Sequence, residues 1–125
     1  MSKDYAEINT LMEHYFEGLY QADSAMLRRV FHPNLAYVCA TKGDPLYLDL
    51  ETYMARIDKR VAPAQSADPR DETVLDITIG TPEMAKVTAR MMLMGRSYLD
   101  FLTLLKTDQG WRVISKIFAY EPLKG

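Results

Sequence analysis

YLDFLTLLKTDQGWRVISKIFAY, residues 98–120, is the stretch of sequence that decides the fold. It holds two runs of strand-forming residues separated by Asp108-Gln109-Gly110, a pattern typical of a β-hairpin because glycine can adopt the left-handed conformation of a short loop. If that loop has three residues, the odd-numbered positions share one face and the even-numbered positions share the other. Both faces are largely apolar. We therefore expect helices to cover one face and a second subunit to cover the other.

The even-numbered face is the one that we expect to form a homodimer interface. Asp100 is the residue least suited to it, because a lone carboxylate in an apolar strand is costly to bury. Arg90 and Lys116 are expected diagonal to Asp100 on the neighbouring strands, where they would form a charge cluster. The alternative is that Asp100 is a catalytic carboxylate. The expected interface consists of Arg90, Met92, Asp100, Leu102, Leu104, Ile114, Lys116 and Phe118.

The first half of the chain alternates helices with short strands. An apolar stripe with helical spacing predicts a helix from Asp4 to about Tyr20. A short helix through Phe31, a strand over residues 35–41, a brief strand over 46–48 and a helix capped by Asp49 should follow. After a polar loop over 62–72, four strands over 73–79, 86–94, 98–107 and 111–120 predict an antiparallel meander.

Composition limits the classes of function. The 125 residues suit one domain, 1–125, with a core of its own, and the net charge of −2 argues against a nucleic-acid surface. No apolar run reaches the roughly 20 residues that cross a bilayer, so we expect no membrane insertion. Cys39 is the one cysteine and MSKDYAEI lacks a signal-peptide core, which predicts a cytoplasmic location.

The order of elements resembles the nuclear transport factor two-like superfamily. Within it, LMEHYFEGLYQAD, FHP, YLDFLTLLK and GWRVISKIF are similar to the branch described as putative lumazine-binding. The resemblance implies an α+β fold, a cone of curved antiparallel sheet with three helices packed on its concave face. It also implies a flat lumazine-like or pterin-like ligand. The superfold hosts isomerases, dehydratases, cyclases and binding modules, so chemistry has to be judged from the site.

Ketosteroid isomerase relatives use three groups that can be sought in this sequence: an aspartate base, a helix tyrosine and a strand aspartic acid. The tyrosine is retained as Tyr15, but Cys39 stands where the base would be and Thr103 where the second donor would be. A thiol with its usual pKa near 8.5 is mostly protonated at neutral pH. Isomerase-type proton transfer is therefore not favoured.

Other polar residues have structural interpretations beside functional ones. Tyr15 is either a core tyrosine or a hydroxyl donor to a ligand, and Cys39 is interpreted as a small buried hydrophobe. His32 should bond to carbonyls at the end of the second helix, with a catalytic imidazole as the alternative. His14 lies off the apolar stripe. With two histidines and no paired acidic or cysteine spacing, we expect no metal site and no cofactor.

Three functions remain open. We favour a protein that binds a small, flat, mostly apolar molecule without catalysis. The second hypothesis is a dehydratase, isomerase or polyketide cyclase that uses Asp100 or His32 with Tyr15. The third is a structural or partner-binding dimer whose cavity is filled by its own side chains. The expected ligand cavity is lined by Tyr15, Tyr37, Cys39, Tyr53, Ile57, Phe101, Thr103 and Trp111.

Overall fold

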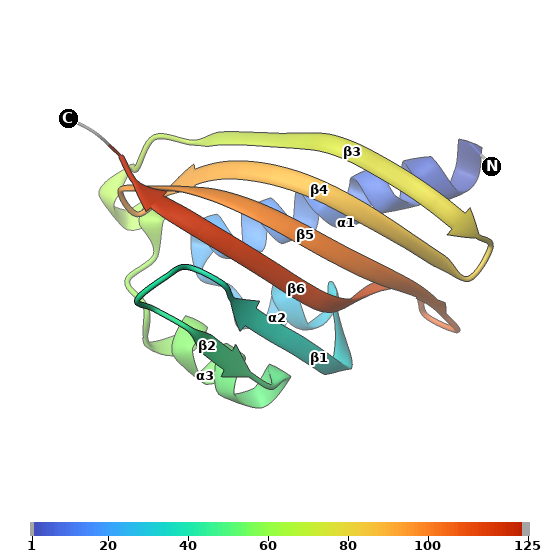
Figure 1. The fold of residues 1–125 in the computed structure, drawn as a ribbon, viewed down its shortest axis with the longest axis horizontal. Coiled ribbons are helices and arrows are strands. Elements are labelled where there is room, and N and C mark those ends of the chain that lie inside the picture. Colours follow the sequence, from blue (N-terminus) through green and yellow to red (C-terminus); the bar gives the residue numbers. More distant parts are fainter. Residues whose placement is uncertain (1, 124–125) are drawn as a thin grey trace.

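A computed structural model describes residues 2–123 and has the α+β architecture that the sequence predicts (Figure 1). Helices occupy the first half of the chain and the long strands occupy the second. The elements in chain order are α1 (Ser2–Gln21), α2 (Ser24–Arg28), β1 (Phe31–Cys39), β2 (Leu46–Leu48), α3 (Leu50–Lys59), a 3₁₀ turn (Pro63–Ser66), β3 (Asp71–Thr81), β4 (Met84–Leu93), β5 (Arg96–Thr107) and β6 (Gly110–Pro122).

The strands form one sheet in the order β2-β1-β6-β5-β4-β3. The meander β3 to β6 is antiparallel, as predicted. The sheet is not antiparallel throughout, however, because β1 pairs with β6 in the parallel direction. The chain reaches β3 from β2 by way of α3 and the 3₁₀ turn. Strand β1 therefore pairs with β6, the last strand, and not with β3.

The helices pack on one face of this curved sheet, and α1 runs behind the long strands in Figure 1. The apolar stripe of α1 is buried as predicted, which confirms its helical spacing. This stripe of α1 consists of Ile8, Leu11, Met12, Tyr15, Phe16 and Leu19.

In residues 2–123, no helix combines the length and the apolar character that a bilayer span requires.

Strand β1 begins earlier than the sequence pattern suggested. The helix expected to run through Phe31 ends at Arg28, and β1 starts at Phe31 and continues through Pro33. Its pairing with β6 shifts register between Phe31 and Ala36. Proline has no N–H for a ladder bond, so an irregularity in the pairing accommodates it within the strand.

The β5–β6 hairpin differs from the predicted one in its loop. Thr107 pairs with Gly110, so the loop has two residues, and a bulge then shifts the register between Leu104, which faces Val113, and Thr103, which faces Ser115. The extra residue reverses the alternation of faces along β6. Trp111 and Val113 consequently point inward together with the even-numbered residues of β5.

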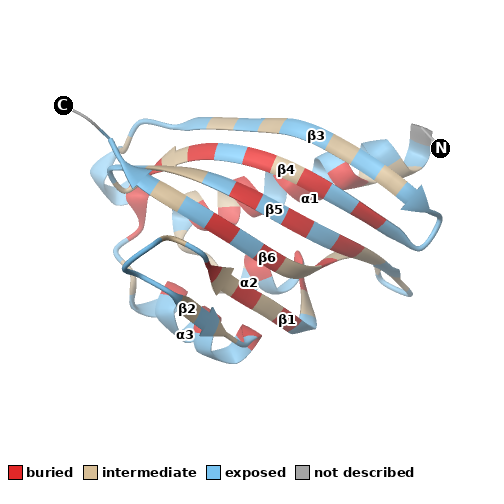
Figure 2. Ribbon diagram, in the orientation of Figure 1, coloured by how far each residue is buried: buried red, intermediate tan, exposed pale blue. Residues whose placement is uncertain are grey.

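Along β5, and in β6 beyond the bulge, the inner and outer faces are the reverse of the expected ones, whereas Trp111 and Val113 point inward as predicted. Figure 2 shows buried and exposed residues alternating along these strands. Leu102 and Leu104 are buried against the helices, whereas Phe101 is 57% exposed and Ile117 is 45% exposed on the outer face. Period-two alternation separates two faces but does not identify the interior one when both are apolar. The expectation that Leu102 and Leu104 face a partner subunit was wrong.

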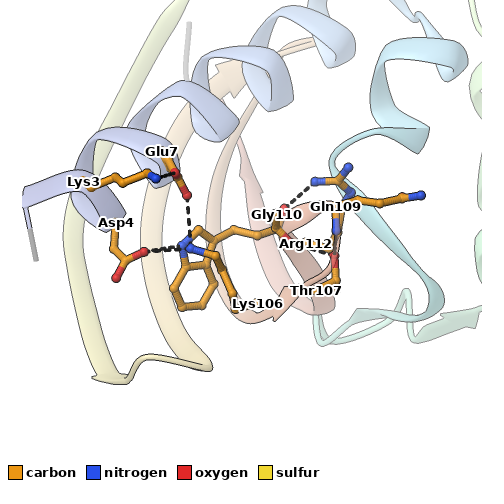
Figure 3. A network of polar contacts seen from close by, with 9 residues as sticks. Lys3, Asp4, Glu7, Lys106, Thr107, Gln109, Gly110 and Arg112 are labelled. Atoms are coloured by element: carbon orange, nitrogen blue, oxygen red, sulfur yellow. Dashed lines mark hydrogen bonds and ion pairs between the residues drawn. The ribbon is translucent and has the colours of Figure 1, made fainter.

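A polar network fastens the N-terminal end of α1 to the β5–β6 hairpin (Figure 3). Lys106 Nζ lies 3.0 Å from Asp4 Oδ1 and 3.3 Å from Glu7 Oε2. Trp111 Nε1 donates to the same Asp4 oxygen at 3.2 Å, and the Lys106 amine lies 5.2 Å from the centroid of the Trp111 ring. These contacts set the position of α1 along the inner face.

This network should make stability fall at acid pH. The hydrogen bond from Lys106, followed by that from Trp111, lowers the pKa of Asp4 in the folded protein. Such a carboxylate stabilises the fold above its unfolded pKa of about 3.9, and the contribution is lost as the pH falls through the lower folded pKa. We expect Lys106→Met to lower the free energy of unfolding in urea at neutral pH, and the difference from wild type to shrink below about pH 4.

Lys59→Met is the control, since Lys59 is an exposed lysine for which the described chain has no ion pair. It should follow the wild-type curve at every pH. Curves for wild type and Lys106→Met that stay equally separated down to about pH 2.5 would show that Asp4 is not the linked group.

Candidate functional site

A buried carboxylate lies at the centre of the inner face. Asp100 is in the middle of β5, paired with Ala89 on β4 and Phe118 on β6, and it is 0% exposed. Tyr15, from the buried stripe of α1, donates its hydroxyl proton to Asp100 Oδ2 over 2.5 Å. Asp100 Oδ1 is equally buried and has no hydrogen-bond partner in the described part of the chain. The Tyr15 hydroxyl is therefore committed to holding this carboxylate.

A buried lysine lies one strand away. Lys116 on β6 pairs with Leu102, which places it diagonal to Asp100 on the inner face, and it is 5% exposed. Its amine is surrounded by aromatic rings rather than by carboxylates. No ion pair joins Lys116 to Asp100 or to any other described acidic residue. The amine lies 4.9 Å from the ring centroid of Tyr15, 5.1 Å from that of Phe118, 5.4 Å from that of Tyr37 and 5.7 Å from that of Tyr53.

Lys116 lines a small pocket that opens at the edge of this aromatic cluster. The pocket has a volume of about 30 Å³, enough for one or two water molecules. Helix α3, the β4–β5 turn and strands β1, β5 and β6 all contribute to it. Its walls include Tyr37, Tyr53, Arg60, Met94, Tyr98 and Lys116.

Burial keeps the tyrosines of this region protonated. It raises the pKa of Tyr15 well above its usual value, and the negative charge of Asp100 adds to the effect. Burial also raises the pKa of Tyr37 and of Tyr53. At neutral pH these hydroxyls are hydrogen-bond donors and not phenolates.

The structure brings only some of the expected cavity residues together. Tyr37 and Tyr53 line the pocket, and their rings are 3.9 Å apart between centroids. Tyr15, Cys39 and Ile57 are buried in the core and do not line it. The cavity expected between the sheet and the helices is thus mostly filled by the protein's own side chains.

The other expected cavity residues lie elsewhere. Phe101 and Thr103 are exposed on the outer face, where Thr103 bonds to Ser115. Placing them in the cavity was wrong, for the reason given for the hairpin faces. Trp111 is on the inner face, but it is bound to Asp4 near the start of α1 and does not line the pocket.

His32 is not at a helix end. It lies in β1, where its Nδ1 accepts a hydrogen bond from the Asn34 backbone N–H over 3.0 Å. The expected bond to free helix carbonyls was wrong, because α2 ends before this residue. His32 lines a surface groove with Arg28 and Glu51, apart from the pocket that holds Lys116.

The expected dimer interface divides between the two faces. Asp100, Leu102, Leu104, Lys116 and Phe118 are all buried on the inner side of the sheet, so placing them at a subunit interface was wrong.

The remaining interface residues keep their predicted side. Arg90 and Met92 line an outer-face groove, and Ile114 lines another beside Thr103. Arg90 is exposed and faces away from Asp100, so it does not contribute to the expected charge cluster. Lys116 does share the inner face with Asp100, although no ion pair joins the two.

Sequence reasoning missed most of the residues that line the pocket, among them Arg60, Met94 and Tyr98. Arg60 follows the last turn of α3, and Met94 is in the β4–β5 turn with a φ of 53°. Arg60 does not belong to a periodic pattern, so no signal in the sequence marked it. Tyr98 shares the inward alternation of Asp100, and it could have been found once the inner face was known.

Comparison with known proteins supports the resemblance seen in the sequence. The family described as "Putative lumazine-binding" matches residues 3–119. The chain belongs to this family. No curated protein matches the sequence.

Solved structures show that this member of the putative lumazine-binding family has the nuclear transport factor two-like fold. An NTF2-like protein of unknown function from Silicibacter pomeroyi has a TM-score of 0.85 at 20% identity, covering 96% of this chain and 98% of its own. One from Shewanella baltica has a TM-score of 0.84 at 23% identity, covering 97% and 96%. A ketosteroid isomerase-like protein from Erwinia carotovora atroseptica has a TM-score of 0.74 at 9% identity, covering 96% and 98%.

Proposed function

We propose that the protein binds a small, flat molecule through the pocket beside Lys116 and does so without catalysis. The observation that carries this proposal is the pocket itself, which the aromatic side chains of Tyr37, Tyr53 and Tyr98 line together with the largely buried Lys116. Apolar walls with a few well-placed polar groups are the usual composition of a ligand site. Membership of a family described as lumazine-binding supports the same class of ligand.

The size of the pocket determines how such a ligand would enter. Sites for drug-sized ligands have volumes of roughly 300–1,000 Å³. The pocket found here, at about 30 Å³, is at least about ten times smaller. The pocket therefore admits one substituent of the ligand. Met94 and Tyr98 are only half-buried, so rotation of these two side chains would admit the flat ring that follows.

A thermal-shift screen of lumazine and related flat heteroaromatic compounds tests the proposal. A ligand of the native state must raise the melting temperature by mass action, and Tyr98→Trp should abolish the shift by filling the pocket. Tyr47→Trp is the matched control, because Tyr47 is exposed on β2 and does not line the pocket. The proposal is wrong if no compound shifts the wild type, or if both variants respond as the wild type does.

An acid–base enzyme is the second candidate. It is favoured by one observation, the buried Asp100 carboxylate with an unpartnered Oδ1. Two others weigh against it: Asp100 does not line the pocket, and the Tyr15 hydroxyl is already bound to Asp100. An enzyme of this kind would lose turnover in Asp100→Asn, whereas a binding protein would retain ligand affinity in that variant.

The proposal includes a homodimer formed through the outer face of the sheet, in the cytoplasm. Phe101 on β5 lies directly opposite Ile117 on β6, and Leu99 is exposed beside them. Three large apolar side chains on neighbouring strands form a patch of the kind that subunits cover. A second copy of this chain suits the patch because a two-fold interface uses the same surface on both subunits.

The free, buried Cys39 suits the reducing compartment that the cytoplasm provides.

A further inference from the structure

We propose that the ligand of the Lys116 pocket carries an anionic group about the size of a carboxylate, which pairs with Lys116 and Arg60. This inference rests on the proposed function of the pocket as a binding site. It names the chemical class that the pocket selects.

The first support is the state of Lys116. Lys116 is only 5% exposed and lines the pocket, and no hydrogen bond or ion pair joins its amine to a described residue. The surrounding ring faces stabilise the positive charge of the Lys116 amine. They carry no lone pair that could accept a hydrogen bond from its N–H groups. An oxyanion in the pocket would supply the missing acceptor.

The second support is the convergence of positive charge. Arg60 lines the same pocket, and no described carboxylate forms an ion pair with it. Burial raises the pKa of Tyr37 and Tyr53, and the positive charge of Arg60 lowers both pKa values in opposition to burial. Its field therefore reaches the pocket walls. Two cations that face one small cavity favour an anion inside it.

The third support is the separation of Asp100 from the pocket. The carboxylate could repel an anion, but it does not line the pocket and it accepts the hydroxyl proton of Tyr15. Burial raises the pKa of Tyr37 and of Tyr53, which line the pocket, so these two hydroxyls add donors and no negative charge. The volume of about 30 Å³ suits a group of a few atoms, with the rest of the ligand outside.

Titration with benzoate and with benzamide, followed by amide chemical shifts in the NMR spectrum, tests this inference. The two probes have the same shape and differ in charge. We expect benzoate to shift the amides of β6 around Lys116 and to bind about tenfold more tightly than benzamide, since one ion pair of about 1.4 kcal/mol corresponds to that ratio. Arg60→Gln and Lys116→Met should each remove the preference.

Arg56→Gln is the matched control, because Arg56 is exposed on the same helix as the pocket wall and does not line the pocket. It should retain the tenfold preference. If Lys116→Met does not fold, Arg60→Gln alone decides, since Arg60 is at the rim. Equal binding of both probes in the pocket would overturn the anionic group and leave the binding site standing. Chemical-shift changes with benzoate that are confined to amides outside the pocket would also overturn the anionic group. If the thermal-shift screen of heteroaromatic compounds failed too, the proposed binding site itself would be wrong.

Discussion

Tyr15→Phe is expected to destabilise the protein by about 3 kcal/mol, measured by urea denaturation at neutral pH. The substitution removes the one described donor to Asp100 Oδ2, while Oδ1 already has no partner. A fully buried carboxylate would then have no hydrogen bond at all, and its desolvation would be uncompensated.

Tyr53→Phe is the matched control for this prediction. Tyr53 is also buried, but no hydrogen bond is found for its hydroxyl in residues 2–123, so its loss should change stability by less than about 1 kcal/mol. The double variant Tyr15→Phe, Asp100→Leu should be more stable than Tyr15→Phe alone, because the unpaired carboxylate is gone. Equal stability of wild type and Tyr15→Phe would show that Asp100 does not depend on this bond.

Phe101→Arg is expected to convert the proposed dimer into a monomer. Phe101 is at the centre of the proposed outer-face interface, and an arginine there would place an unpaired charge between two apolar surfaces. A central aromatic residue of an interface contributes about 2 kcal/mol or more, so the dissociation constant should rise at least about 30-fold. Sedimentation equilibrium at micromolar concentration measures this change.

Val61→Arg is the control for the dimer. Val61 is 69% exposed just after α3, away from the outer face, and a charge there should leave the dimer intact. A wild-type protein that sediments as a monomer at micromolar concentration would contradict the dimer itself. A Phe101→Arg variant that remains dimeric would show that subunits meet through another surface.

Local sequence patterns predicted the helices and strands well, but they did not predict which face of the hairpin points into the core. The stripe of α1 follows helical spacing, and the turns around the long strands have glycines where the chain reverses, so both could be located from sequence alone. The inner face of the hairpin could not, because both faces are apolar and a single extra residue near Ile114 exchanges them part-way along β6. That bulge leaves no mark in composition.

The candidate site was predictable only in part, for a related reason. Tyr37 and Tyr53 were identified because they lie on the buried faces of elements with clear patterns. Lys116 was expected near Asp100, but its aromatic surroundings come from α1, α3 and β1, which meet only in the folded chain. Packing, and not local pattern, determines that the interior keeps a pocket of only about 30 Å³.

The parallel pairing of β1 with β6 has a consequence for how the chain acquires its structure during synthesis. Residues 31–39 leave the ribosome early, but the strand they must join is the last of the described strands to be made. Until then β1 has only the three-residue β2 beside it, and the long-range contact closes last. Nascent chains stalled before residue 110 should therefore remain open to proteases along β1, and protection should appear only when the final strand has emerged.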